Sequence, residues 1–504
     1  MLLQSQKLIP WERKNYVLTI IHFFIHAVIL SLLVAGFISV DYASEGGLSW
    51  YFDQTTKLTD YVYTVIFVVL ICVAIYVYLY AEFRDFLMKG KNVALIFVIT
   101  EVCLIIYLAM GKYINVYARP AALFALLILL LINKRCSLFL NFMFCLTLFI
   151  VDVFVNSSMD ALEATAELVI NACSSVFAIY LVDGIRSRIK VFFMGFLVAI
   201  PISVCSALSF LINTVTINDA ASILLVSLHG FIGGITSVVI MMAVLPIFEW
   251  AFNMLTDYRL AEITDHKSRL IKNMIENAGG TFNHSTVVAH LAENCATAIG
   301  ENPLLARACA YYHDIGKLKQ PIYFTENQHG YNPHDDLTPE LSTEIIRSHT
   351  QDGYDLIRKY HLPQILADVA LEHHGTLPIQ YFYAKAQKFT DGEVDIADFC
   401  YHGPKPNSKI AAIIMIADGC EAAVRAQADR SRDKVEKMVA SIIDDRMRKE
   451  QFSDCEITMR ELDIIEDALV NALSGVYHDR IKYPKMNKHG NAFSAEKSDK
   501  NGQD

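Results

Sequence analysis

Residues 311–317 read YYHDIGK, in which the adjacent His313 and Asp314 place an imidazole and a carboxylate side by side. Further side chains of these two kinds occur in the strings FNHS, IIRSHTQDG, LEHHGT and MIADG. They are His284, His349, His373, His374 and Asp418. Scattered core or surface histidines are the alternative interpretation. An HD doublet, an HH doublet and a later Asp, all near expected helix ends, favour one shared site instead.

Metal binding is the chemistry that this set of side chains predicts. Imidazole and carboxylate together suit borderline divalent ions such as Fe, Mn or Zn, and this many ligands exceeds what one ion takes. In a site with two ions, a carboxylate bridges both, and a shared hydroxide is acidic enough to attack phosphorus near neutral pH. We therefore expect two divalent transition-metal ions, Fe or Mn before others, and hydrolysis of a phosphoester.

The residues around these ligands predict an all-helical domain. Beyond Trp250, apolar residues recur three and four positions apart, and an alternating strand pattern is almost absent. The domain is expected to span 251–483, and the polar tail 484–504 is expected to be disordered. The predicted helices cover 285–300, 304–318, 339–360, 363–373, 408–426, 432–448 and 458–479.

The first half of the chain, residues 1–250, has a different composition. The whole chain is 54% hydrophobic and 19% charged, against about 25% charged residues in soluble domains. Because about 20 apolar residues cross the hydrocarbon core of a bilayer as a helix, the long uncharged runs predict a polytopic transmembrane bundle of about eight spans. These runs lie near 16–40, 61–80, 92–110, 117–133, 136–156, 166–183, 190–213 and 221–248.

Lys and Arg are distributed unevenly among the loops, which predicts the orientation of the bundle. The loops expected on one side hold Lys7, Arg13, Lys14, Arg84, Lys89, Lys91, Lys134, Arg135, Arg186, Arg188 and Lys190, and the other side holds Lys57, Lys112 and Arg119. Both termini are therefore expected in the cytoplasm. Polar residues inside the spans, of which Glu101 and Asp152 are examples, are expected to form interhelical hydrogen bonds, with a ligand-sensing or ion path as the alternative.

Cysteine usage and net charge exclude several classes of protein. The 11 cysteines occur singly without a C-x-x-C pair, which is typical of neither a disulfide framework nor a zinc ribbon. The net charge of −10 and the absence of a basic tract argue against a nucleic acid polymer as partner. The expected partners are the lipid bilayer and a small anionic substrate, and a homodimer is left open.

Five strings together resemble one known family. They are YYHDIGKLKQPIYFTENQ, NPHDDLTPELS, LEHHGT, GPKPNSKIAAIIMIADGCEAAVRA and, at the membrane exit, LPIFEWAFNMLTD. The chain resembles the seven-transmembrane HD family of bacterial cyclic-di-AMP phosphodiesterases from its second span to about Pro484. The resemblance implies a multi-pass protein of the bacterial cytoplasmic membrane with a cytoplasmic HD domain. It also implies hydrolysis of cyclic di-AMP to linear 5′-pApA by a two-metal hydroxide mechanism.

The resemblance also implies roles for individual residues. Asp314 would bridge the metals and, with Lys317, form the catalytic pair, Lys317 reaching a phosphate oxygen. A solvated surface lysine is the alternative for Lys317. Asn332, His334 and Tyr312 would contact substrate, although a turn-and-cap role or a core position explains them as well. One metal would bind His284, His313, Asp314 and Asp418, and the other would bind Asp314, His349, His373 and His374.

One departure and three rival functions accompany this resemblance. Members of the family typically carry a large extracytoplasmic domain between the first two spans, where this chain has about 20 residues, near 41–60. A cyclic-di-GMP phosphodiesterase of the HD-GYP type should follow the HH doublet with Glu and a later G-Y-P, but this chain reads HHGTLPIQYF. A nucleotide triphosphohydrolase needs fewer of the ligands, and a non-enzymatic nucleotide receptor would be expected to lack one.

Overall fold

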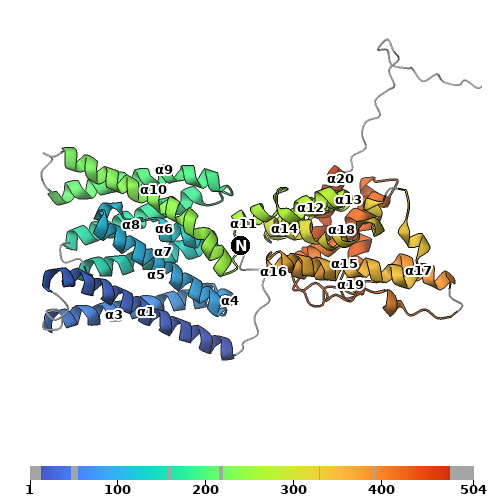
Figure 1. The fold of residues 1–504 in the computed structure, drawn as a ribbon, viewed down its shortest axis with the longest axis horizontal. Helices are drawn as coiled ribbons and strands as arrows, with labels where there is room; N and C mark the ends of the chain where they lie inside the picture. The colour runs from blue at the N-terminus through green and yellow to red at the C-terminus, as the bar shows by residue number, and fades with distance from the viewer. Residues whose placement is uncertain are drawn as a thin grey trace, which may run out of the picture.

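The computed structural model describes residues 13–46, 55–155, 161–214, 220–328, 330–389 and 392–476. These residues are mainly helical, and extended pairing among them is limited to one antiparallel bridge between Pro378 and Cys400. Two large hydrophobic cores form. The buried residues of one come from the segment Phe23 to Tyr258, and those of the other come from the segment Leu260 to Leu473. The all-helical fold expected from the sequence is confirmed (Figure 1). The predicted disordered tail, 484–504, lies outside the described residues.

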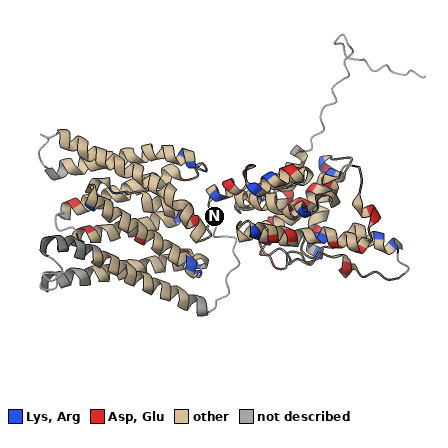
Figure 2. Cartoon of the chain, viewed as in Figure 1, with Lys and Arg blue, Asp and Glu red and all other residues tan. Residues whose placement is uncertain are grey.

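The N-terminal body is a bundle of apolar helices. Seven of its helices, α1, α3, α5, α7, α8, α9 and α10, are long and apolar enough to cross a membrane, and charged side chains are sparse along them (Figure 2). The chain is a multi-pass membrane protein. The elements are α1 (Arg13–Gly46), α3 (Thr55–Glu82), α4 (Arg84–Leu87), α5 (Gly90–Tyr113), η1 (Val116–Ala118), α6 (Leu123–Leu131), α7 (Lys134–Val155), α8 (Ala161–Val182), α9 (Arg188–Thr214) and α10 (Ala220–Ala251).

The segment expected as the fourth span, 117–133, is not one continuous helix. It consists of the 3-10 turn η1, an extended residue at Arg119 with φ −62° and ψ 141°, and the nine-residue helix α6. Pro120 explains the break, because it lacks an N–H and disfavours helical backbone in the residue before it. With a rise of 1.5 Å per residue, α6 alone covers about half of a bilayer's hydrocarbon core.

Three contacts place the Lys- and Arg-rich connections at the same end of the bundle. They link α1 to the α4–α5 connection, the end of α3 to the start of α7, and the start of α7 to the end of α8. Thr19 Oγ1 donates to Leu87 O at 3.1 Å, Tyr78 Oη donates to Arg135 O at 3.2 Å, and Lys134 Nζ pairs with Asp183 at 2.9 Å. The short segment 116–131 therefore returns the chain to this end, as a complete span would.

The C-terminal body places its helices by recognisable local signals. Asn302 caps α14 by accepting hydrogen bonds from the backbone N–H groups of Leu304 and Leu305, and Pro303 occupies the first helical position. Thr338 caps α15 in the same way. The elements are α11 (Asp257–Ile263), α12 (Arg269–Asn277), α13 (Gly279–Ile299), α14 (Pro303–Tyr312), η2 (Ile315–Lys319), η3 (Pro321–Tyr323), η4 (Thr325–Asn327), η5 (Pro333–Asp336), α15 (Pro339–Lys359), α16 (Gln364–Glu372), α17 (Gln380–Phe389), η6 (Ile396–Phe399), α18 (Lys409–Ala426), α19 (Arg432–Arg448) and α20 (Met459–Val476).

Helix α11 joins the two bodies through ion pairs and hydrogen bonds. Arg188, at the start of α9, pairs with Glu249 of α10 at 3.2 Å and with Glu262 of α11 at 2.7 Å. The hydroxyl of Tyr258 donates to Ile185 O at 2.8 Å. Glu249 is 4% exposed, and breaking a buried ion pair of this kind is strongly destabilising. The connection between bundle and C-terminal body is therefore held by specific polar contacts.

Candidate metal centre

Five helices of the C-terminal body each contribute to one buried cluster. His284 lies in the second turn of α13, His313 ends α14, and Asp314 follows it at the start of η2. The remaining members come from α15, the end of α16 and α18. They are His349, His373, His374 and Asp418.

Gly316 allows the HD doublet to approach α15 closely. A Cβ atom at this position would lie 2.0 Å from His349 O and 2.5 Å from Gly353 N. Both contacts are with backbone, which cannot move aside as a flexible side chain can. A glycine is therefore required here if Asp314 and His349 are to face one another.

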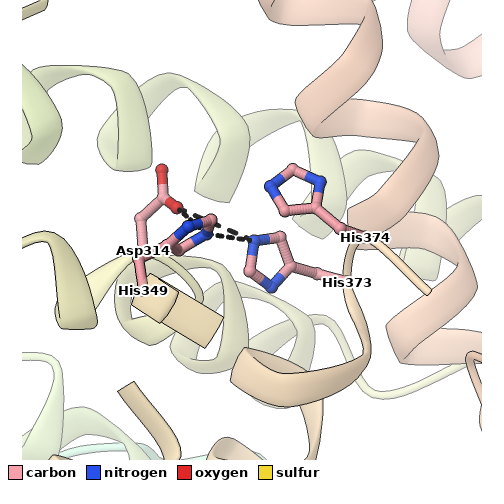
Figure 3. A group of neighbouring side chains, drawn as sticks. All are labelled: Asp314, His349, His373 and His374. Carbon is pink, nitrogen blue, oxygen red and sulfur yellow. Dashed lines mark hydrogen bonds and ion pairs between the residues drawn. The ribbon is translucent and has the colours of Figure 1, made fainter. Parts of the chain in front are cut away.

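One group consists of Asp314, His349, His373 and His374, whose ligand atoms all lie within 4.8 Å of one another. Asp314 Oδ1 lies 3.3 Å from His349 Nε2 and 3.7 Å from His373 Nε2. The two imidazole nitrogens of His349 and His373 are 3.3 Å apart. Figure 3 shows the carboxylate and these rings pointing into a common space.

A second group lies on the other side of the same carboxylate. It consists of His284, His313 and Asp314, again within 4.8 Å. Asp314 Oδ2 lies 3.2 Å from His313 Nε2 and 3.7 Å from His284 Nε2. Asp418 Oδ1 adds a further ligand atom 3.0 Å from His284 Nε2. Asp314 thus presents one oxygen to each group, which is the geometry of a bridging carboxylate.

Backbone carbonyls orient three of these imidazole rings. The Nδ1 atoms of His313, His349 and His373 lie 2.6, 2.6 and 2.9 Å from the carbonyl oxygen three residues earlier in their own helices. A carbonyl only accepts hydrogen bonds, so each Nδ1 must carry the proton. In the neutral ring the lone pair is then on Nε2, the atom that faces the cluster, as a metal-binding histidine requires.

Burial and neighbouring charges set the protonation of the first group. Burial lowers the pKa of His373 to about 4, and it also holds the pKa of His374 well below the ordinary value. Burial alone would raise the pKa of Asp314, but the neighbouring His313 and the cationic Lys317 outweigh it and hold that pKa well below the usual range. Neutral imidazoles and an ionised carboxylate are the forms that bind metal.

His284 carries carboxylates on both of its nitrogens. Its Nδ1 lies 2.5 Å from Glu421 Oε2, and its Nε2 lies 3.0 Å from Asp418 Oδ1. Burial lowers its pKa, but the hydrogen bonds to Asp418 and Glu421 outweigh this effect and raise the pKa to about 10. Glu421 accepts the hydrogen bond from the Nδ1–H of His284 and also pairs with Arg425 at 3.4 Å. Nε2 is then the atom that faces Asp418 and could carry a proton or bind a metal ion.

The donor set fits a divalent metal. His313 Nε2 and Asp314 Oδ1 are buried and make no hydrogen bond within the described part of the chain. Unsatisfied buried polar atoms cost about 1–3 kcal/mol each, and both of these atoms face the cluster. Imidazole nitrogen and carboxylate oxygen at these separations are the ligands that Fe, Mn and Zn accept. The cluster could therefore hold divalent metal ions.

Lys317 lies inside the cluster and not on a solvated helix face. It belongs to the 3-10 turn η2, and its side chain is 13% exposed. Its Nζ lies 2.7 Å from Asp314 Oδ2 and 2.9 Å from Glu326 Oε1, and 5.0 Å from the centre of the Phe324 ring. Burial opposes the charge, but the carboxylates of Asp314 and Glu326 outweigh it and raise the pKa of Lys317. Lys317 is therefore cationic and fixed next to Asp314.

The three expected substrate contacts occupy structural positions. Asn332 caps η5 by accepting a hydrogen bond from His334 N at 3.2 Å, and His334 Nε2 lies 3.0 Å from Tyr323 O. Tyr312 is 1% exposed, and its hydroxyl donates to Ile263 O at 2.6 Å. The Tyr312 ring therefore has no exposed face on which a base could stack. The contacts of Asn332 and His334 are those of a turn and a helix cap, the alternative role considered for them in the sequence.

Glu326, which pairs with Lys317, and two further residues near the cluster were missed by the sequence analysis. Glu421 could have been found, because it lies three residues after Asp418 on α18 and so shares its face. The ring of Tyr401 stacks on His374 with the ring centres 4.3 Å apart. Tyr401 lies in an irregular segment, so no periodic pattern marks it.

Two family models match the chain. The HD domain model matches residues 281–423, and the model described as "7TM receptor with intracellular HD hydrolase" matches residues 58–256. Together they cover more than half of the chain, in the order that the second description states. This chain belongs to that family. The family expected from the sequence strings is confirmed.

Relatives within this seven-transmembrane HD family include two proteins named cyclic-di-AMP phosphodiesterase PgpH. The Listeria monocytogenes serotype 1/2a (strain 10403S) protein is 36% identical over 442 residues, which is 86% of this chain and 60% of the relative. The Bacillus subtilis (strain 168) protein is 37% identical over 416 residues, which is 79% of this chain and 56% of the relative. This chain therefore spans little more than half the length of these curated relatives.

A crystal structure of a single domain also matches. It is the HD domain of L. monocytogenes phosphodiesterase PgpH in complex with cyclic-di-AMP, which is 49% identical and has a TM-score of 0.41. The match covers 42% of this seven-transmembrane HD protein and 99% of that chain.

Replacing Glu421 tests the arrangement around His284. In Glu421→Gln the amide cannot supply the negative charge that keeps the Nδ1 proton and the ring orientation of His284. Loss of such a supporting partner typically weakens metal binding by about 10- to 100-fold. Metal affinity measured by equilibrium dialysis should fall by this factor for one of two ions. Glu293→Gln is the matched control, because Glu293 lies on α13 and pairs with Arg307, so it should leave the metal affinities of the wild type unchanged. Metal affinities in Glu421→Gln equal to those of the wild type would contradict the assignment.

Proposed function

We propose that this chain is a membrane-bound phosphodiesterase that hydrolyses cyclic di-AMP to linear 5′-pApA. The observation that carries the proposal is the carboxylate of Asp314, whose two oxygens face two separate groups of imidazoles. The names of the two relatives, cyclic-di-AMP phosphodiesterase PgpH, support this choice of substrate. The reaction adds one water across one P–O3′ bond, leaving a 5′-phosphate monoester and a free 3′-hydroxyl.

The proposed metal ligands are the seven side chains of the cluster. His284, His313, Asp314 and Asp418 would hold one ion, and Asp314, His349, His373 and His374 would hold the other. We propose Fe or Mn, because a set dominated by imidazole with a shared carboxylate suits borderline ions. When bound, the two ions would acidify a water molecule and offset the charge of the phosphate.

The chain's own groups would position the substrate. The cationic Lys317 is held against Asp314, inside the cluster where the phosphate would bind. We therefore propose that its Nζ contacts a nonbridging phosphate oxygen. The ring of Tyr401 stacks on His374, and its hydroxyl interacts electrostatically with Lys317 and Asp314. Burial raises the pKa of Tyr401 above its ordinary value. Its neutral hydroxyl would therefore serve as a hydrogen-bond donor and not as a base.

We propose that the HD body faces the cytoplasm and that the chain works as two units, residues 1–250 and 251–483. Arg84, Lys134 and Arg188 lie in or next to connections at the bundle end nearest the HD body (Figures 1 and 2). Positive residues favour the cytoplasmic side. A homodimer remains a prediction. The contacts described above all lie within one chain and do not bear on it.

A substrate panel tests the activity. Purified full-length protein supplied with Mn²⁺ or Fe²⁺ should convert cyclic di-AMP to 5′-pApA, with cyclic di-GMP turned over far more slowly, as followed by chromatography. Asp314→Asn keeps the shape of the side chain but removes the shared charge, so it should lose the activity and most of the bound metal. Preferred turnover of cyclic di-GMP or of nucleoside triphosphates would replace the proposed substrate, and binding without turnover would indicate a receptor.

Replacing Lys317 tests the proposed phosphate contact. A hydrogen bond to a charged group contributes about 1.5–3 kcal/mol, so kcat/KM for Lys317→Ala should fall by roughly 10- to 150-fold. Both metals should be retained, since Lys has no lone pair to offer when charged. Lys319→Ala is the matched control, because Lys319 lies two residues on, is 66% exposed and pairs with Asp352. Unchanged kinetics in Lys317→Ala would return this residue to a structural role.

Reporter fusions test the orientation and the short fourth crossing. A fusion after Thr55 should report the outer side, whereas fusions after Arg135 and Pro484 should both report the cytoplasm. The Arg135 fusion is decisive for the segment 116–131. If that segment did not cross, Arg135 would report the outer side and the HD body would follow it. Matching signals at Thr55 and Pro484 would contradict the proposed orientation.

A further inference from the structure

The bundle contains a buried ion pair at the break before α6. Arg119 and Asp152 are 5% and 1% exposed, and Arg119 Nη1 donates to both oxygens of Asp152 at 2.8 and 2.9 Å. The guanidinium also lies over the ring of Tyr107, 4.6 Å from its centre. Charged groups inside a membrane bundle are costly and commonly mark a functional site.

The irregular backbone next to this pair is held firmly by neighbouring helices. Ser175 Oγ of α8 donates to Ala121 O at 2.8 Å, and Ala122 N donates to Ser237 Oγ of α10 at 3.3 Å. A Cβ atom at Gly233 would lie 2.6 Å from Arg119 O, so α10 packs directly on the break. Non-helical backbone at membrane depth persists where protein groups satisfy it or where it lines a polar site.

A third acidic side chain in this region has an oxygen without a hydrogen-bond partner among the described residues. Glu167 of α8 is 4% exposed, and its Oε1 makes no hydrogen bond within the described residues. Arg119 Nε is likewise buried without a hydrogen bond. Asn171 lies one turn after Glu167 on the same face of α8, and its amide donates to the Tyr107 hydroxyl at 2.5 Å. Glu167 is therefore directed into the same polar cluster.

The charged and titratable groups around Glu167 come from several elements. Arg119, Asp152 and Glu163 interact with it electrostatically, as do Tyr107 of α5 and Tyr117 of η1. From α10, His229 lies one turn before Gly233 on the face that packs against the break, and its Nδ1 also has no hydrogen-bond partner among the described residues. The described residues of α6 contribute no titratable group to the cluster.

The charges of the buried cluster do not balance. Arg119 contributes one positive charge, and Asp152 and ionised Glu167 contribute two negative charges. An unpaired ionised carboxylate is strongly unfavourable in a low-dielectric interior, so it takes up a compensating cation or a proton. We propose that the cluster binds one monovalent cation at Glu167, either a proton or an alkali-metal ion.

The position of the cluster indicates the side from which the cation arrives. Asp152 lies three residues before the end of α7, and Glu167 lies six residues after the start of α8. These ends are opposite to the end that contacts α11. Glu163, one turn nearer the end of the bundle, is only partly buried and provides a carboxylate between the surface and Glu167. The cation therefore reaches the site from the side of the membrane opposite to the HD body.

Thermal unfolding of the full chain in lipid nanodiscs tests the proposal without any use of phosphodiesterase activity. The Tm of the wild type and of Glu167→Gln is measured across a range of pH in N-methylglucamine buffer, which contains no alkali-metal ion. As pH rises, the wild type should lose at least about 2 °C more in Tm than Glu167→Gln does. Glu167→Gln is neutral and of the same shape, so it should lack this component. Titration of the HD cluster is common to both proteins and cancels in the comparison. Glu82→Gln is the matched control, because Glu82 is exposed at the end of α3 on the other side of the bundle, and it should behave as the wild type.

Two further arms separate the sources of the positive charge. If Na⁺ or K⁺ is bound, adding either salt at constant high pH should restore the Tm of the wild type but not that of Glu167→Gln. If a proton is bound, salt has no such effect, and the infrared spectrum of the wild type should contain a protonated-carboxyl band that Glu167→Gln lacks. Equal dependence of the two proteins on pH and on salt would overturn the proposal. If Glu167→Gln does not fold, Glu167→Asp replaces it. This variant should shift the midpoint of the dependence of Tm on pH or on salt, and an unshifted midpoint would contradict the proposal.

Discussion

The C-terminal body depends on keeping the carboxylate of Asp314 charged in the protein interior. This side chain is 1% exposed, and an uncompensated buried charge costs several kcal/mol. Lys317 supplies a compensating positive charge, and imidazoles on α13, α14, α15 and α16 surround the two carboxylate oxygens. Because these groups start from different helices, the helices must converge on one point. The close approach at Gly316 and the backbone hydrogen bonds of the histidine rings follow from that requirement.

The membrane half meets the same requirement in a different solvent. Where water is absent, every backbone group and every charge must find its partner within the chain. Glu101 pairs with His26 at 2.8 Å, and Arg119 pairs with Asp152. Ser175 of α8 and Ser237 of α10 satisfy backbone groups at the break before α6, and Gly233 allows α10 to pack directly on it. Such polar residues therefore hold the bundle together, whereas a few buried polar atoms, Glu167 Oε1 and His229 Nδ1 among them, have no hydrogen-bond partner among the described residues.

The two halves are physically continuous through α11. Arg188 binds both Glu249 and Glu262, so the start of α9, the end of α10 and α11 share one network. At its other end, α11 supplies the carbonyl of Ile263 that accepts the hydrogen bond of Tyr312. Tyr312 immediately precedes the HD doublet. A displacement of the bundle end would therefore be carried by a single short helix to the residue next to His313.

The sequence by itself determined the helical class, the apolar spans and which histidines and aspartates form the cluster, because hydropathy, helical periodicity and adjacent doublets depend on residues close together in the chain. It placed the fourth span only approximately, since the effect of Pro120 depends on which neighbouring helices satisfy the broken backbone. Only the tertiary structure decided that Lys317 is buried against Asp314, that Tyr312 faces α11, and that Glu421 supports His284 across 137 residues. The contacts of Tyr312 and Glu421 join segments 49 and 137 residues apart, and the burial of Lys317 beside Asp314 depends on how Glu326 and the surrounding helices pack. No local pattern in the sequence encodes that packing.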